Sequence, residues 1–161
     1  MINKKKIELI RNDINKLYNK QYEKLNKSEI NYNNDERGRT KYIGEVLNGV
    51  PNGRGIMYYT WGDIYKGDWR NEKKEGKGVY YWNDGDRYEG DFRNGKKEGK
   101  GIAYFHNGDR YEGDFRNDNR EGKGIYYYNN GDREMGDYYN DKPIGKHVML
   151  TRNGEVKINN Y

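Results

Sequence analysis

A 23-residue period is the feature that most limits what this chain can fold into. Tyr42, Tyr65, Tyr88 and Tyr111 are spaced 23 residues apart, and a fifth unit begins at Glu134. The aligned units begin YIGEV, YKGDW, YEGDF, YEGDF and EMGDY, and nineteen of the 22 glycines fall in four columns of the alignment. Such a period is typical of a repeat array, in which each unit buries its apolar face by stacking on its neighbours. The predicted array covers residues 42–156, as units 42–64, 65–87, 88–110, 111–133 and an atypical 134–156.

Each unit is expected to form a β-hairpin. In Tyr88–Arg93 apolar and polar residues alternate, which indicates a half-buried strand, and Asn94–Gly95 is a typical tight turn. A second strand is predicted at Lys100–Phe105, and the Asn-Gly-Asp sequence within His106–Arg110 returns the chain to the next hairpin. The predicted fold is therefore mainly β: an elongated, twisted, single-layer antiparallel sheet, or solenoid, of stacked hairpins.

The second strand of each unit is apolar on both faces. Gly99, Gly101 and Ala103 share one face, which we expect to pack against the Tyr88 and Phe92 rings. The other face carries a recurring pair of apolar residues, and we call these residues the ladder. Two interpretations stay open: the ladder rings stack on one another along the sheet, or the ladder forms a groove for a helix or an extended peptide. The candidate groove residues are Ile56, Tyr58, Val79, Tyr81, Ile102, Tyr104, Ile125 and Tyr127, and the ladder extends to Val148 and Leu150.

The composition does not contradict a folded sheet. Charged residues (35%) outnumber apolar ones (32%) and mean hydropathy is −1.46, values that approach those of disordered chains. The 18 tyrosines offset this, because each ring can bury a large area although it scores as polar. The chain has no cysteine, no apolar run long enough to span a membrane and no signal-peptide pattern. We therefore expect a soluble cytoplasmic protein that is not secreted.

The repeat unit Y-E-G-D-F-R-N-x-x-x-E-G-K-G-I-x-Y-x-x-x-G-D-R resembles the MORN repeat (membrane occupation and recognition nexus). The resemblance covers residues 42–156 and weakens in the last unit, where Glu134 and His147 replace Tyr and Gly. It implies a non-catalytic scaffold of cytoskeletal, ciliary or membrane-associated assemblies. Some proteins of this family pair with themselves, some hold a peptide in a groove, and phosphoinositide binding has been proposed for several.

The net charge of +5 belongs to one segment. Residues 1–27 carry eight Lys and Arg against three acids, whereas residues 28–41 carry three of each sign and residues 42–161 carry twenty of each. An apolar stripe at helical spacing predicts an amphipathic α-helix over roughly residues 2–27. Residues 28–41 are predicted to be a linker and residues 157–161 a C-terminal tail. The candidate helix interface is Ile7, Ile10, Ile14, Leu17 and Leu25, and the candidate lipid contacts are Lys4, Lys5 and Lys6.

Three roles for this helix stay open. It docks on its own sheet or pairs with a second copy as a homodimer, it binds a partner protein, or it lies on an anionic membrane. The three acids in the segment and the lack of Trp and Phe count against the membrane role.

The residues do not predict a catalytic, metal or cofactor site. His106 and His147 fall in different columns with no cysteine near them, and nearly every recurring aspartate has Lys or Arg within two residues, which favours ion pairs over calcium. Lys73–Lys74 and Lys96–Lys97 are each followed by a glutamate, and a neutral array is a poor nucleic-acid groove. The sequence therefore predicts a non-enzymatic scaffold or assembly subunit that binds partner proteins through the ladder and the helix. The alternative is a peripheral adaptor that binds anionic lipid.

Overall fold

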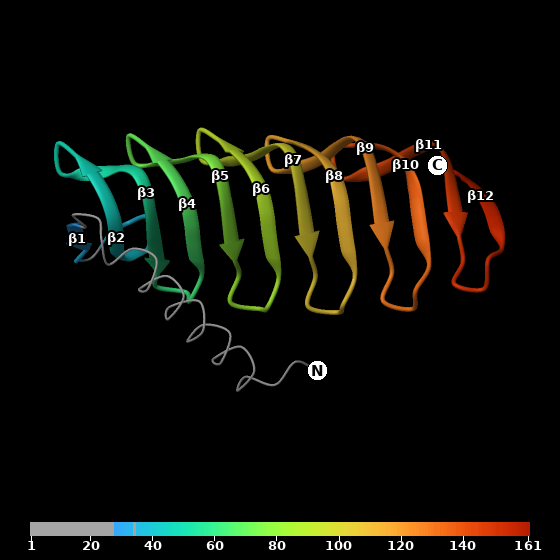
Figure 1. Cartoon of the computed structure of the whole chain (residues 1–161), viewed down its shortest axis with the longest axis horizontal. Helices are drawn as coiled ribbons and strands as arrows, with labels where there is room; N and C mark the ends of the chain where they lie inside the picture. Colours follow the sequence, from blue (N-terminus) through green and yellow to red (C-terminus); the bar gives the residue numbers. More distant parts are fainter. Residues whose placement is uncertain (1–27, 34) are drawn as a thin grey trace.

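The computed structural model describes residues 28–33 and 35–161. These residues form one open antiparallel sheet of twelve strands, and the strands follow one another across the sheet in chain order. Figure 1 shows the hairpins side by side along the long axis of the molecule. The mainly β, hairpin-repeat prediction is confirmed. The predicted helix over residues 2–27 lies outside the described residues.

Two strands belong to every repeat unit, and further strands extend the sheet at both ends. The bounds are β1 Ser28–Asn31, β2 Arg39–Leu47, β3 Val50–Tyr59, β4 Ile64–Arg70, β5 Lys73–Tyr81, β6 Arg87–Arg93, β7 Lys96–Tyr104, β8 Arg110–Arg116, β9 Asn119–Tyr127, β10 Arg133–Tyr139, β11 Lys142–Leu150 and β12 Val156–Asn160.

Both segments that were predicted to flank the array contribute strands to the sheet. The linker predicted over residues 28–41 contains β1 and the start of β2, and β1 pairs antiparallel with β2. The prediction of a tail over residues 157–161 is also wrong, because these residues contain most of β12, which pairs with β11. Both strands are short and polar, and they become strands because an edge of the array offers them unpaired backbone groups.

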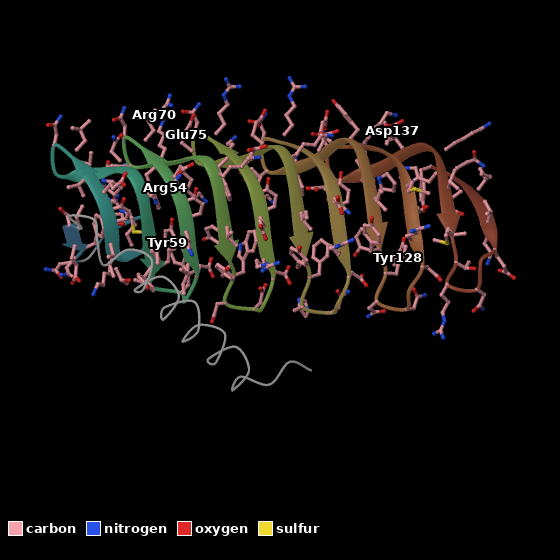
Figure 2. The ribbon with its side chains drawn as sticks, in the orientation of Figure 1. Arg54, Tyr59, Arg70, Glu75, Tyr128 and Asp137 are labelled. Carbon is pink, nitrogen blue, oxygen red and sulfur yellow. The ribbon has the colours of Figure 1, made fainter. Side chains whose placement is uncertain are left out.

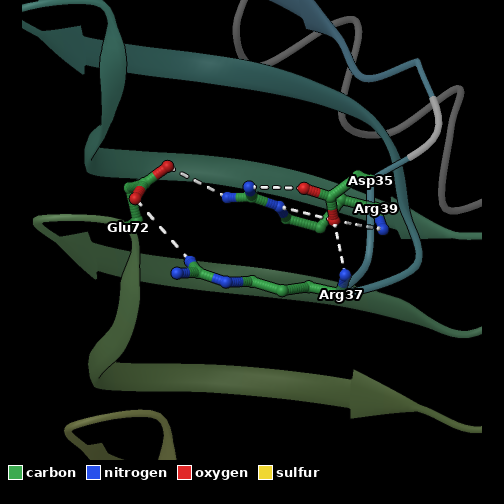
Figure 3. Close-up of polar contacts among 4 residues, drawn as sticks. All are labelled: Asp35, Arg37, Arg39 and Glu72. Carbon is green, nitrogen blue, oxygen red and sulfur yellow. Dashed lines mark hydrogen bonds and ion pairs between the residues drawn. The ribbon is translucent and has the colours of Figure 1, made fainter.

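The loop between β1 and β2 is ordered by Asp35. Its carboxylate accepts backbone N–H bonds from Arg37 (3.0 Å) and Arg39 (3.1 Å) and forms an ion pair with the Arg39 guanidinium at 2.7 Å. These bonds, the one from the Arg39 side chain foremost, lower the pKa of Asp35 to about 2. Arg39 also reaches Glu72 at 3.0 Å, which ties this loop to the β4–β5 turn (Figure 3).

The core lies on one face of the sheet, which we call the ring face. The four tyrosines that begin units one to four are fully buried there, although no second layer of strands covers them. Tyr88 makes edge-to-face contacts with Phe92 in its own unit (5.2 Å between ring centroids) and with Phe115 in the next (4.9 Å). Each such pair adds about 0.5–1.5 kcal/mol to what burial of the rings provides. The rings therefore link successive units as well as the strands within one.

Glycine is required where the rings lie against the sheet. A Cβ atom on Gly101 would come within 2.4 Å of the Tyr88 ring, and one on Gly124 would lie as close to Tyr111. The tyrosine ring thus occupies the space that a side chain would fill, and its hydroxyl donates to the backbone carbonyl three residues later, as Tyr88 does to Asp91 at 3.1 Å. The expected packing of Gly101 and Ala103 with the Tyr88 and Phe92 rings is confirmed.

Side-chain caps at both edges of the sheet join each unit to the next. At one edge, Asp109 Oδ1 accepts the backbone N–H of Asn129 at 2.8 Å, and Asp63, Asp86 and Asp132 make the same contact. At the hairpin-turn edge, Glu75 Oε2 accepts the backbone N–H of Asn94 at 3.0 Å. Figure 2 shows Glu75 and the projecting Arg70 at this edge. The acids of these two columns are therefore caps between units.

The fifth unit exchanges an aromatic ring across two strands. Units one to four place Tyr at their first position and Gly thirteen residues later, whereas this unit has Glu134 and His147. The fully buried His147 ring fills the space beside Gly136, and its Nε2 donates to the Asp137 carbonyl at 2.9 Å, as the Tyr111 hydroxyl does to Asp114. The last unit thus keeps a ring in this place but supplies it from the opposite strand.

As a result of this exchange the carboxylate of Glu134 is buried, and the residue is only 3% exposed. Burial alone would raise the pKa of Glu134, but hydrogen bonds from Asn159 (2.7 Å), Tyr128 (2.8 Å) and Tyr161 (2.9 Å) outweigh it and lower the pKa. Since Asn159 and Tyr161 lie in and just beyond β12, this carboxylate fastens β12 to the end of the array.

Candidate partner-binding groove

The ladder side chains project from the face of the sheet opposite to the ring face, which we call the ladder face. Ladder residues occupy every second strand, so Val79 on β5 lies opposite Glu89 on β6, and Glu89 lies opposite Ile102 on β7. A groove of 1360 Å³ runs along this face from Arg54 on β3 to Lys146 on β11. Figure 2 shows how far apart Arg54 and Asp137, which both line it, lie along the sheet.

Four of the eight predicted groove residues line the groove. They are Val79, Tyr81, Ile102 and Ile125, and all four are partly exposed. Apolar side chains held at the bottom of a shallow channel are available to a partner, because its contacts displace water from them. The structure therefore places half of the predicted set together, in one continuous line across five strands.

Ile56 and Tyr58 belong to a separate buried cluster at the N-terminal end of the ladder. Ile56 is 1% exposed and packs with Ile64, and the rings of Tyr58 and Tyr81 lie against the pair. Val148, the ladder residue at the C-terminal end, is 38% exposed. Burial of the ladder thus differs strongly between its two ends.

Arginine side chains cover the last two predicted tyrosines. The Arg87 guanidinium lies 4.1 Å from the centroid of the Tyr104 ring, and Arg110 lies at the same distance from Tyr127. Stacking of this kind contributes about 0.5–1 kcal/mol at exposed sites. These tyrosines are therefore partly occupied by contacts within the sheet, and a partner that used them would have to move an arginine.

The rims of the groove carry ion pairs with the period of the repeat. Lys77 pairs with Asp91 at 2.6 Å and Lys100 with Asp114 at 2.5 Å, each between neighbouring units. The lysine side chains are more than 70% exposed, so these pairs contribute little to stability. The same aspartates also order the backbone, since Asp91 Oδ2 accepts the backbone N–H of Lys100 at 3.3 Å across a β-bulge. Along the rims, charges can therefore be exchanged with a partner at low cost.

The size and shape of the groove favour a polypeptide. Pockets for small molecules are concave and measure about 300–1,000 Å³. This groove is larger, open along its length, and crosses eight strand spacings, or about 38 Å. A helix of seven turns or an extended segment of about a dozen residues has that length.

The described residues contain no cluster for metal binding. No three of their His, Asp and Glu side chains are grouped so as to hold a metal ion. His106 lies in an exposed turn against Asp86 at 2.8 Å, and His147 belongs to the core. No helix in the part of the chain that the structure describes has the length and apolarity needed to cross a membrane.

Sequence reasoning missed several residues of the groove. Lys66, Glu89, Glu112 and Met135 line it together with the ladder residues. The signal was available, since the alternation in Tyr88–Arg93 already assigns Glu89 to the face opposite the rings. The predicted interface Ile7, Ile10, Ile14, Leu17 and Leu25, and the lipid contacts Lys4, Lys5 and Lys6, lie outside the described residues.

Comparison with known proteins identifies the repeat but does not identify a ligand for the groove. The family model for the MORN repeat matches residues 42–64, 65–87, 88–110 and 111–133 in succession. Among curated proteins, no sequence matches the chain significantly.

One similar solved structure is the SAS-4 (dCPAP) TCP domain in complex with a proline-rich motif of Ana2 (dSTIL) of Drosophila melanogaster. It is 19% identical in sequence, and the match covers 84% of this chain and 90% of that one with a TM-score of 0.40.

Proposed function

Because the chain belongs to the MORN-repeat family, we propose that it is a non-enzymatic scaffold or assembly subunit that binds a partner protein along the ladder face. The partner would be a helix or an extended segment that lies across β5 to β9. We place the protein in the class of complexes to which the family resemblance points, which are cytoskeletal, ciliary or membrane-associated.

One observation carries the proposal: the ladder face has an open groove with an apolar floor, away from the buried tyrosines of the ring face. The core is on the ring face, where the tyrosines are fully buried, whereas Val79, Ile102 and Ile125 remain partly exposed to solvent. Apolar area left in contact with water over such a length favours an interaction surface.

The test is capture of partners from an extract by the full chain and by a variant with Tyr81→Ala and Ile102→Ala. We expect the variant to lose at least tenfold in recovery of a bound chain, because it removes the centre of the apolar floor. Its circular dichroism should stay close to that of the parent, since neither residue belongs to the ring face, whereas loss of the Tyr81 ring from the Ile56 and Ile64 cluster should lower the unfolding midpoint moderately.

The matched control is Arg93→Ala with Arg116→Ala, which removes two exposed residues at the hairpin-turn edge. Recovery should be unchanged in this control. Equal recovery by the groove variant and the control would overturn the proposal.

A second candidate, an adaptor on anionic lipid, is favoured by the +5 charge of residues 1–27. Basic residues near such a surface contribute about 1 kcal/mol each. In this case the full chain should sediment with phosphatidylserine vesicles, and replacement of Lys4, Lys5 and Lys6 by Gln should weaken sedimentation at least tenfold. Binding that does not differ between anionic and neutral vesicles would eliminate this candidate.

A further inference from the structure

We propose that the N-terminal part of the ladder face is occupied by the chain's own residues 1–27, bound through the stripe Ile7, Ile10, Ile14 and Leu17. This segment would cover one end of the ladder, and no external partner is needed for it to do so.

The first observation is the uneven burial of chemically equivalent residues. Ile56, Ile102 and Val148 occupy the same column of the repeat, yet Ile56 is 1% exposed, Ile102 is partly exposed and Val148 is 38% exposed. The directly paired residues do not explain the difference. Ile56 is flanked by Ile43 and Lys66, side chains of about the same size as the glutamates that flank Ile102. Ile64 and the Tyr58 and Tyr81 rings shield part of Ile56, and we attribute the rest of its burial to a cover beyond the sheet.

The second observation is the composition of this end of the ladder face. The column that holds Arg87, Arg110 and Arg133 in later units holds Ile64 in the first, and Ile64 is 7% exposed. Where Arg87 shields Tyr104 with a charged group, Ile64 presents an aliphatic side chain to the Tyr58 and Tyr81 rings. An apolar stripe fits this end better than the others, because an isoleucine stands there in place of the arginine of later units.

The third observation is the place where residues 1–27 join the sheet. Ser28 lies opposite Gly44, in the middle of β2 and not at a hairpin turn. Glu29 lies opposite Ile43, which in turn is paired with Ile56, and Glu29 pairs with Lys41 at 2.9 Å. A chain that enters at this point needs few residues to reach the buried cluster, and a short tether gives it an effective concentration in the millimolar range.

Length and charge are compatible with this occupant. As a helix, the stripe from Ile7 to Leu17 would measure about 15 Å, or about three strand spacings, which is the extent of the N-terminal end of the ladder face. The eight basic residues of the segment need not meet the groove lysines, because an amphipathic helix turns its charges away from the surface that its apolar stripe covers.

The experiment uses the absence of cysteine from the chain. Single variants Ile56→Cys and Val148→Cys of the full-length protein are treated with a thiol reagent, and the rates of modification are compared. We expect Ile56→Cys to react at least tenfold more slowly than Val148→Cys. Adding Ile10→Asp and Ile14→Asp should raise the Ile56→Cys rate about tenfold, equivalent to about 1.4 kcal/mol, and leave Val148→Cys unchanged.

Asn12→Asp with Asn15→Asp is the matched control, because it adds the same charge to the segment away from the stripe. It should not change either rate. Protection of Ile56→Cys that survives Ile10→Asp and Ile14→Asp would show that the sheet itself buries this position, and would overturn the proposal. Protection that disappears on dilution would assign the site to a second copy and would overturn it as well.

These rates are measured without any partner. A failed capture experiment therefore leaves the inference standing, and a failed protection experiment leaves the proposed partner groove standing.

Discussion

The ring face and the ladder face are built from alternate residues of the same strands, yet they have opposite properties. On β7, Gly101 lies beneath the buried Tyr88 ring, whereas the next residue, Ile102, remains partly exposed on the floor of a groove. The ring face is closed by contacts between units, and the ladder face is left open. The comparison indicates that the array buries most of its core on one face and leaves a groove on the other.

The largest expected effect comes from removing a ring on the closed face. Tyr88→Ala should lower the free energy of unfolding by about 3–5 kcal/mol, because it empties a site between two phenylalanines. Tyr104→Ala, sixteen residues later on the open face, should cost about 1 kcal/mol, mainly its contact with Arg87. Urea unfolding followed by circular dichroism measures both. Equal losses in the free energy of unfolding for the two variants would contradict the assignment of the core to the ring face.

The replacement of Tyr and Gly by Glu134 and His147 in the fifth unit allows a sharper test of how rings fill the ring face. His147→Gly leaves the space beside Gly136 empty, and Glu134→Tyr brings a second ring into space that His147 already fills, so each should cost about 2 kcal/mol. The double variant restores the pattern of units one to four. It should be more stable than the sum of the single effects predicts, with a coupling of about 1–3 kcal/mol in thermal unfolding. Additive losses would show that the two positions do not share one ring site.

The smallest expected effect concerns a charge on the closed face. Lys74 Nζ lies 4.5 Å from the centroid of the Tyr80 ring, and burial lowers the Lys74 pKa from 10.5 to about 8. Between these values the unfolded chain binds more protons than the folded one, so stability should rise as pH increases from about 8 towards 10. The raised pKa values of the buried tyrosines act in the opposite direction, but only above pH 10.

Replacing Lys74 by Met should therefore reduce the rise between pH 8 and 10 and should stabilise the protein by about 1 kcal/mol at neutral pH. Part of the rise should remain, because burial also lowers the pKa of Lys97. Unfolding midpoints in urea across this range provide the measurement. Lys73→Met, at the exposed neighbouring position, is the control and should leave the slope unchanged. A slope that is the same with and without Lys74 would assign the whole effect to other groups.

The period of the sequence predicted most of the fold, because each unit carries its own turn and its own alternation. The Asn94–Gly95 turn has positive φ at both residues (50° and 89°), as the sequence predicts, and β6 spans Arg87–Arg93 where a strand was expected over Tyr88–Arg93. β1 and β12 could not be predicted in this way. They are short and most of their residues are polar, and pairing with an existing edge decides their conformation.

The groove was harder to predict than the fold, since its lining depends on which strands lie side by side. The sequence indicated Val79, Tyr81, Ile102 and Ile125 but not that Arg87 would cover Tyr104. In the fifth unit, Glu134 and His147 looked like two separate losses from the repeat. Only the pairing of β10 with β11 shows that one ring has moved between strands.

The caps between units act over one repeat length only, and this sets how the protein can change in evolution. Asp109 holds Asn129 and Glu98 holds Asn117, so a duplicated block of 23 residues carries with it every partner that it needs. Each duplication adds two strands and about 10 Å to the groove without disturbing either end. Duplication can therefore change the length of the groove only in fixed steps, whereas the modified last unit can serve only once.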